Sequence, residues 1–328
     1  MFFRKRKDNS NITRILYASD FHGSDAFFRK FLSAALRYEA NVLITGGDLT
    51  GKAMIPIINK GKGRFSGHLF GRKEETSTPE ELEKLKQTIS NVGFYPIVLE
   101  PDEAVELETN NDLMAAKFEQ EMCKRIRQWL TLFDEKLGSC GLPLYFLPGN
   151  DDLYSIDKII AEFEDRNVYN PDNKRYMIDE YHEIIGLSYS NMTPWHCNRD
   201  VEEEELSHSL TMIADSLEFP ERAITVLHVP PFKSGLDVCP ELDEDLHIIH
   251  RGGQVLMKPV GSTAVREFIE KVQPLLSLHG HIHEAPGHTR IGRTLAINAG
   301  SEYAEGIMKA AIINLEKDRV KGHVLISG

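Results

Sequence analysis

Cysteine is scarce in this chain, and none of it is spaced for a redox or zinc motif. Four cysteines occur among 328 residues, and no pair has C-x-x-C spacing. They are Cys123, Cys140, Cys197 and Cys239. Reduced thiols are the simple interpretation, so we expect a cytoplasmic protein and not a secreted one stabilised by disulfides.

Long apolar runs and an excess of positive charge are also absent. No stretch approaches the roughly 20 apolar residues of a membrane helix, so we expect no membrane partner. Residues 1–7 are basic, but no apolar segment follows them, so they do not predict a secretory signal. The net charge of −12 argues against bulk nucleic-acid binding, which depends on clustered Lys and Arg. It does not exclude a phosphorylated substrate, because bound divalent metals would invert the local field.

The chain does contain a regular series of short apolar runs that end on polar side chains. The runs are 15–18, 42–45, 144–147, 224–227, 275–278 and 295–297. The side chains that follow them are Asp20 and His22, Asp48, Asn150, His228, His281 and His283, and Asn298. Such runs predict buried strands. Because ligands bind at the carboxyl ends of strands in α/β folds, one rim should collect several His and Asp side chains and an Asn.

The side-chain types at this rim are typical of metal ligands. Asp20 and His22, like His281 and His283, are separated by one residue, so each pair can lie on one side of an extended segment. Carboxylate, imidazole and amide oxygen suit Mn²⁺, Fe²⁺/Fe³⁺, Zn²⁺ or Ni²⁺. Seven candidate ligands exceed the four of one tetrahedral zinc site. We therefore predict two divalent ions roughly 3.5–4 Å apart.

Each short motif taken singly has an ordinary explanation. Asp-x-His pairs are common without a metal, and surface histidines such as His208 and His247 are expected to be solvated. The prediction depends on the whole series, in which each motif follows its own apolar run.

With these motifs in order, the chain resembles the calcineurin-like metallophosphoesterases, of the Icc-related phosphoesterase type. The matching motifs are Asp20-Phe21-His22, Gly47-Asp48, Gly149-Asn150-Asp151-Asp152, His228 and Gly280-His281-Ile282-His283. The resemblance covers residues 13 to about 315 and implies that the first metal takes Asp20, His22, Asp48 and His283. The second would take Asp48, Asn150, His228 and His281, with Asp48 bridging both. A metal-activated hydroxide would be the nucleophile.

One position departs from the family pattern. Members of the family usually have histidine directly after the motif asparagine, where it assists the phosphoryl transfer, and this chain has Asp151. An ionised aspartate cannot donate a proton and would repel phosphate. Three explanations are open. Asp151 is held protonated, its side chain is turned away from the phosphate, or another donor such as His22, His279 or an arginine takes the role of the histidine. We take Asp151 and His22 as the candidate catalytic residues.

The resemblance implies a four-layer α/β/β/α sandwich of two mixed sheets, with residues 1–328 forming one domain. Residues 52–100 predict a β-β-α-β insertion, in which Thr78 caps a helix that runs to about Asn91. This insertion is either structural packing or a lid or partner surface over the metal rim. Residues 103–137 predict one long helix, and residues 201–217 a solvated one. Trp195 lies in a loop, where it either packs or stacks on a substrate.

The function that these observations favour is metal-dependent hydrolysis of a phosphodiester, phosphomonoester or pyrophosphate bond. The substrate would be a small phosphorylated molecule, with nucleotides among the candidates. The sequence leaves the oligomeric state open, and a homo-oligomer is one alternative. The alternative is a non-catalytic scaffold of the same fold that binds a protein partner. Loss of metal ligands usually marks such scaffolds, and every ligand position is filled here.

Overall fold

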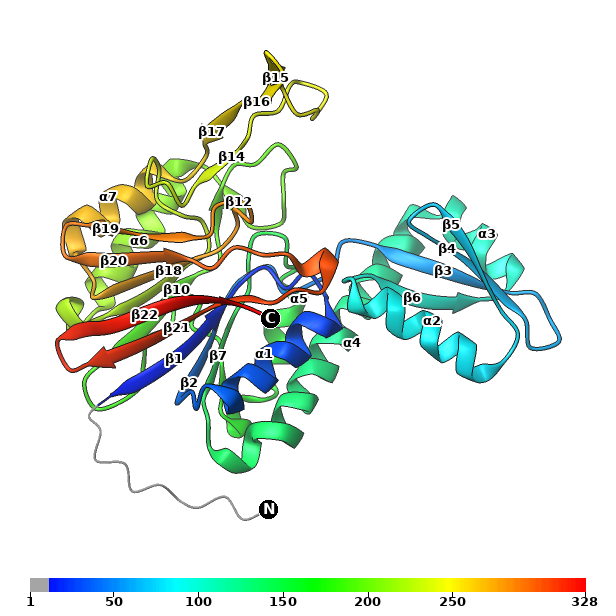
Figure 1. The fold of residues 1–328 in the computed structure, drawn as a ribbon, viewed down its shortest axis with the longest axis horizontal. Helices are drawn as coiled ribbons and strands as arrows, with labels where there is room; N and C mark the ends of the chain where they lie inside the picture. The colour runs from blue at the N-terminus through cyan, green and yellow to red at the C-terminus, as the bar shows by residue number, and fades with distance from the viewer. Residues whose placement is uncertain (1–11) are drawn as a thin grey trace.

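The computed structural model describes residues 12–328, which form a two-sheet body and a smaller lobe beside it (Figure 1). The α-helices among these residues are α1 (Asp25–Arg37), α2 (Pro79–Asn91), α3 (Pro101–Thr109), α4 (Asn111–Leu137), α5 (Ser155–Ala161), α6 (Glu203–Ser216) and α7 (Thr263–Val272). The basic head at residues 1–7 lies outside the described residues.

The first sheet of the body has the strand order β22-β21-β1-β2-β7-β8. These strands are β1 (Thr13–Ala18), β2 (Val42–Gly46), β7 (Leu144–Leu147), β8 (Val168–Tyr169), β21 (Lys309–Glu316) and β22 (Arg319–Ser327). From β1 to β8 the strands are parallel, with Ile15 opposite Val42 and Leu43 opposite Leu144. Strands β21 and β22 add an antiparallel edge, so the sheet is mixed.

The second sheet has the order β19-β20-β18-β13-β10-β9. Its strands are β9 (Tyr176–Met177), β10 (Glu183–Leu187), β13 (Ile224–Leu227), β18 (Leu276–His279), β19 (Gly287–Ile291) and β20 (Thr294–Asn298). Strands β10, β13, β18 and β20 are parallel, and β9 and β19 are antiparallel edges. All six predicted apolar runs are therefore buried strands.

Alternating side chains divide the body into four layers. On β1, Ile15 and Tyr17 face the second sheet, where they share a buried cluster with Ile224 and Leu276. Leu16 faces the other way, into a cluster with α1, α4 and α5. The outer face of the second sheet is covered by α6 and α7. This period-two alternation of buried faces gives the order helix, sheet, sheet, helix, and it confirms the predicted α/β/β/α sandwich.

The lobe contains a four-stranded sheet of its own, in the order β5-β4-β3-β6. Its strands are β3 (Met54–Asn59), β4 (Phe65–Leu69), β5 (Arg72–Thr76) and β6 (Tyr95–Leu99). The first two strands of the predicted β-β-α-β insertion, β3 and β4, pair as an antiparallel hairpin. The predicted helix cap is also present, since Thr78 Oγ1 accepts a hydrogen bond from Glu81 N at 3.2 Å. The strand β5 was missed, because its run of charged residues has no apolar face. It is an exposed edge strand, where charge prevents pairing with another chain.

Two helix predictions need correction. The expected helix over residues 103–137 is broken at Asn110, which ends α3 and caps α4 by accepting a hydrogen bond from Leu113 N at 3.0 Å. The helix α6 is not solvated all round, because Leu206, Leu210 and Ile213 are buried against the second sheet. The glutamate run had masked this apolar stripe.

Short strand pairs complete the fold. They are β11 (Ser190–Asn191) with β12 (Asp200–Val201), β14 (Val238–Pro240) with β17 (Met257–Pro259), and β15 (His250–Arg251) with β16 (Gln254–Val255). The segment 238–259, which we call the flap, projects from the body (Figure 1). Within residues 12–328, no helix combines the length and apolar character that crossing a membrane requires.

Candidate metal centre

The seven candidate ligands lie directly after parallel strands of the two sheets. Asp20 and His22 follow β1, Asp48 follows β2, Asn150 follows β7, His228 follows β13, and His281 and His283 follow β18. The carboxyl ends of these strands meet at one rim, as expected for an α/β fold. The structure brings all seven side chains together there.

Asp20, His22 and His283 form the first group. Their ligand atoms all lie within 4.8 Å of one another. His22 Nε2 lies 3.1 Å from His283 Nε2, and His283 Nε2 lies 3.5 Å from Asp20 Oδ1. Lone pairs that converge in this way can be satisfied together by one cation.

Asp48, His228 and His281 form the second group, again within 4.8 Å. The amide oxygen of Asn150 joins them, at 2.9 Å from His228 Nε2 and 3.1 Å from His281 Nδ1. The Asn150 amide has a defined orientation, because its Nδ2 donates to Asp200 Oδ1 at 2.8 Å. The oxygen is thereby turned toward the histidines.

Asp48 lies between the two groups. Its Oδ2 is 3.6 Å from His22 Nε2 in the first group, and its Oδ1 is 3.3 Å from His228 Nε2 in the second. One carboxylate therefore presents one oxygen to each set of donors, which is the arrangement that a bridging ligand requires.

The backbone at this rim is strained. Asp20, His22, Asp48 and His281 have φ angles of 58°, 40°, 49° and 66°, in the left-handed region that few non-glycine residues adopt. Such residues cost about 1–3 kcal/mol each and persist only where the surrounding structure enforces them. Gly149 shows how tight this packing is, since a Cβ there would lie 2.2 Å from Asp48 N.

Asp152 enforces much of this geometry from behind the rim. It is fully buried, and its carboxylate accepts hydrogen bonds from Leu49 N, Thr50 N and Gly149 N at 2.7–3.1 Å. The carboxylate therefore ties the loop after β2 to the loop after β7. These loops carry Asp48 and Asn150.

The charges of the centre fit divalent cations. Burial lowers the pKa of His281 to about 3 and that of His22 well below its usual value, so both imidazoles are neutral. Burial also lowers the pKa of His228, but the neighbouring Asp48 carboxylate outweighs it and raises the value to about 9. The Asp48 carboxylate thus favours a proton on the His228 imidazole, and a bound cation would replace that proton. Hard oxygen donors and neutral imidazoles suit first-row divalent metals.

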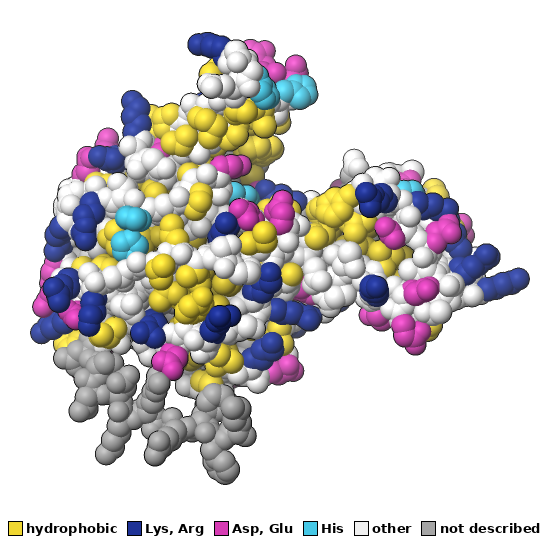
Figure 2. Space-filling model, in the orientation of Figure 1, with side chains coloured by type: hydrophobic (Ala, Val, Ile, Leu, Met, Phe, Trp, Pro, Cys, Tyr) yellow, Lys and Arg dark blue, Asp and Glu magenta, His cyan; other side chains and the backbone are white. Residues whose placement is uncertain are grey.

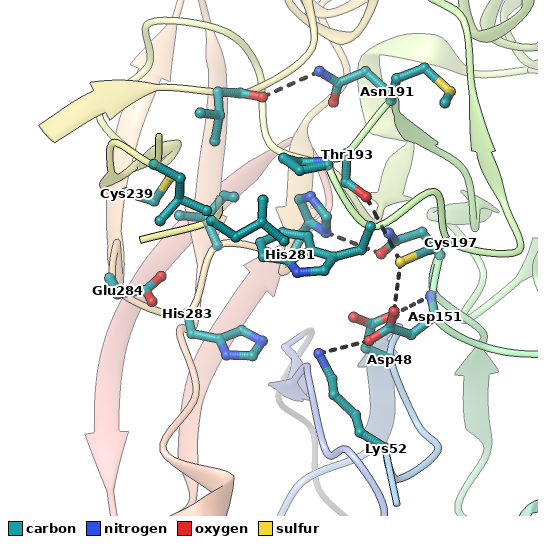
Figure 3. Close-up of a pocket in the computed structure, with 18 of the residues that line it drawn as sticks. Asp48, Lys52, Asp151, Asn191, Thr193, Cys197, Cys239, His281, His283 and Glu284 are labelled. Atoms are coloured by element: carbon teal, nitrogen blue, oxygen red, sulfur yellow. Dashed lines mark hydrogen bonds and ion pairs between the residues drawn. The ribbon is translucent and has the colours of Figure 1, made fainter. Parts of the chain in front are cut away.

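Asp151 does not point freely into the centre. Its Oδ2 pairs with Lys52 Nζ at 2.9 Å, and its Oδ1 accepts from Cys197 Sγ at 2.8 Å (Figure 3). Burial raises the pKa of this carboxyl, but the charge of Lys52 outweighs that effect and holds the pKa well below its usual range. Asp151 is therefore ionised, which excludes the protonated state considered from the sequence.

A pocket of about 1460 Å³ opens over the centre, and apolar side chains form much of its wall. Trp195 is 62% exposed, and Met192 lies near it in sequence on the same wall. Leu246 and Ile248 of the flap also line the pocket, and Figure 2 shows hydrophobic side chains gathered at the flap's base. The interpretation of Trp195 as a packed loop residue is therefore wrong.

No residue between Ala53 and Met114 lines this pocket, so the lobe does not cover it. The flap, in contrast, contributes lining residues such as Leu246 and Ile248. The basic side chains of the turn at residues 60–64 stand toward the far end of the lobe (Figure 2). They add no positive charge to the pocket.

Sequence reasoning missed three residues of the site: Lys52, Asp152 and Asp200. Asp152 lies two residues after Asn150, within the quoted motif, but had no role assigned to it, whereas the other two carry no motif. Conversely, two residues near the predicted rim are structural. Asn298 Nδ2 donates to Leu236 O and Ile282 O, and His279 Nδ1 contacts Leu227 O at 2.9 Å.

Comparison with known proteins supports the fold. No protein-family model and no curated protein matches the chain. One solved structure matches with 17% identity and a TM-score of 0.55, over 96% of this chain and 98% of its own. The protein TT1561 of Thermus thermophilus matches with 14% identity and a TM-score of 0.53, over 97% of this chain and 98% of its own.

A dimetal phosphatase from Danio rerio has 11% identity and a TM-score of 0.44, over 96% of this chain and 98% of its own. Likeness at these identities shows the fold alone, and the two structures with TM-scores above 0.5 are the ones that establish it. The two matches therefore support the α/β/β/α fold of this chain.

Proposed function

We propose that this protein is a metal-dependent phosphohydrolase with a dinuclear site. The observation that carries the proposal is the position of Asp48, whose two oxygens face two separate groups of donors. Asp20, His22 and His283 would hold one divalent ion with Asp48. Asn150, His228 and His281 would hold the other with Asp48.

Bound ions would supply Lewis acidity toward the phosphoryl oxygens and a water that is nucleophilic at neutral pH. The protein's own residues hold the donors in place before a substrate arrives. Asp200 fixes the amide of Asn150, and Asp152 holds the loop that carries Asp48. Such preorganisation is the main electrostatic contribution that a protein makes to this class of reaction. No protein nucleophile is required.

His22 acts as a metal ligand in this proposal and not as a proton donor. Its Nε2 faces the first group, and its Nδ1 has no hydrogen-bond partner, lying 3.7 Å from Asp151 Oδ2. Because burial lowers its pKa well below the usual value, the imidazole is neutral and carries one proton, which lies on Nδ1 if Nε2 is a ligand.

The pocket favours a phosphodiester or pyrophosphate with an apolar or aromatic group beside the scissile phosphorus. Its volume of about 1460 Å³ exceeds the roughly 300–1,000 Å³ of common ligand pockets, so a nucleotide-sized substrate fits. Trp195 offers an exposed ring on which a base or aryl group could stack.

The test of this function is hydrolysis of bis-p-nitrophenyl phosphate by protein stripped of metal and reloaded with Mn²⁺, Zn²⁺, Ni²⁺ or Fe²⁺ one at a time. We expect activity that requires metal, with about two ions bound per chain by plasma emission. Two ions bound without turnover of this ester or of a nucleotide panel would favour the non-catalytic scaffold instead.

Trp195→Ala should raise the Michaelis constant for an aryl phosphodiester by about 5- to 100-fold, since stacking on an aromatic side chain contributes about 1–3 kcal/mol. Metal content and the affinity for inorganic phosphate should stay unchanged. Met212→Ala is a matched control, because Met212 is equally exposed on α6 but lies outside the pocket. Equal effects of the two substitutions would exclude a substrate contact at Trp195.

A further inference from the structure

The residue that replaces the family histidine has both carboxylate oxygens engaged. Lys52 Nζ lies 2.9 Å from Asp151 Oδ2, and Cys197 Sγ lies 2.8 Å from Asp151 Oδ1 (Figure 3). The Asp151 side chain is only 21% exposed, whereas the Lys52 side chain is 51% exposed toward the pocket. The group that a ligand meets at this position is therefore the ammonium of Lys52.

The backbone that carries Lys52 is held on both sides. Thr50 N donates to Asp152 Oδ1 at 2.8 Å, and Gly51 N contacts the Tyr95 hydroxyl of the lobe at 2.6 Å. A Cβ on Gly51 would lie 2.0 Å from Gly93 O, so the lobe backbone packs directly against this segment. Because the backbone is fixed, the Lys52 side chain starts from a defined position, and its ion pair with Asp151 places Nζ beside that carboxylate.

The pocket has little positive charge of its own. Of the described residues that line it, Lys52 and Lys258 are the lysines, and no arginine is among them. Lys258 belongs to β17 in the flap, whereas Lys52 lies four residues after Asp48. Lys52 is thus the cation placed beside the candidate metal centre, where a phosphoryl group would have to lie.

We propose that Lys52, oriented by Asp151, binds the phosphoryl group of the substrate in the place of the histidine that the related motif carries. The proposal rests on the proposed phosphohydrolase function. An ammonium has three donors, so one can stay with Asp151 while the others reach phosphate oxygens. Asp151 in this arrangement is a positioning residue, and its charge no longer repels the substrate because it is paired.

The experiment measures binding of inorganic phosphate by calorimetry to metal-loaded protein, with metal content by plasma emission. Lys52→Met should weaken phosphate binding by about 10- to 100-fold, as expected for a charge-assisted hydrogen bond. Lys52→Arg should restore most of the affinity. Lys60→Met makes the same charge change on the exposed turn of the lobe and should have no effect.

Unchanged phosphate affinity in Lys52→Met with full metal content would overturn the proposal. Loss of metal in Lys52→Met would also overturn it, because the lysine would then support the metal centre and not the phosphate. This binding experiment needs no turnover. If phosphate binds through Lys52 but no ester is hydrolysed, the phosphohydrolase function fails and the binding site remains.

The role of Asp151 is tested by a double-mutant cycle. Asp151→Ala should weaken phosphate binding several-fold when Lys52 is present. In Lys52→Met it should not weaken binding, because the carboxylate is then unpaired, has no lysine to position and repels phosphate. Equal losses in both backgrounds would mean that Asp151 acts without Lys52. Tighter phosphate binding in Asp151→Ala would mean that its repulsion outweighs its positioning, and either result overturns this role.

Discussion

Asp48→Asn should remove at least one metal equivalent and reduce phosphodiester hydrolysis by at least about 10³-fold. The estimate follows because the loss of bridged metal charge is worth several kcal/mol in the transition state and each 1.4 kcal/mol is tenfold in rate. Asparagine keeps one oxygen and tolerates the φ of 49° at this position, so the backbone should be retained. The measurements are plasma emission for metal content and initial rates with bis-p-nitrophenyl phosphate.

The matched control is Asp245→Asn. Asp245 belongs to an exposed group with Asp243 and His247 in the flap, whose geometry could also hold an ion. Its substitution should leave metal content and rate unchanged if the bound ions lie at the rim. An Asp48→Asn variant with full metal content and near-normal rate would refute the bridging role, and metal loss in Asp245→Asn would place an ion in the flap.

Asp152→Ala should destabilise the metal-free protein by about 3 kcal/mol or more. The substitution leaves the buried N–H groups of Leu49, Thr50 and Gly149 without their acceptor, and each unsatisfied buried donor costs roughly 1–3 kcal/mol. The loop with Asp48 should then relax from its strained conformation, and metal affinity should fall as well. Urea unfolding of the metal-free protein isolates the stability effect from metal binding.

Asp165→Asn serves as the control for this variant, because the Asp165 side chain is 79% exposed. Surface substitutions of this kind usually change stability by less than about 0.5 kcal/mol. If Asp152→Ala unfolds at the same urea concentration as the parent protein, the buried carboxylate does not hold the two loops together.

The six core strands could be predicted because their information is local. Each is a short run of β-branched, leucine or aromatic residues bounded by turn residues, and burial on both sides removes any need for polar alternation. The Thr78 cap is equally local, since Thr78 Oγ1 accepts from the backbone N–H of Glu81, three residues further along the chain. The charged strand β5 has no such signal, and its pairing with β4 alone defines it.

The convergence of the metal-type side chains was also predictable, because parallel strands place their carboxyl ends at one edge. Their assignment as ligands remains a prediction until metal is measured. The resemblance implied that Asp48 bridges, but only the structure gives the distances from its two oxygens to the two groups. These distances depend on the left-handed turns at Asp20 and Asp48, which the hydrogen bonds of distant residues such as Asp152 enforce.

The sequence by itself thus determined that each candidate motif follows a buried strand, the types of candidate donor at the rim, and the aspartate at position 151 where the resembled motif has histidine. Only the tertiary structure decided which side chains surround Asp151. Lys52 and Cys197 are 99 and 46 residues away from Asp151 in sequence, yet both contact it. Side chains without a motif become functional only through long-range packing, and such packing leaves no periodic signal in the chain.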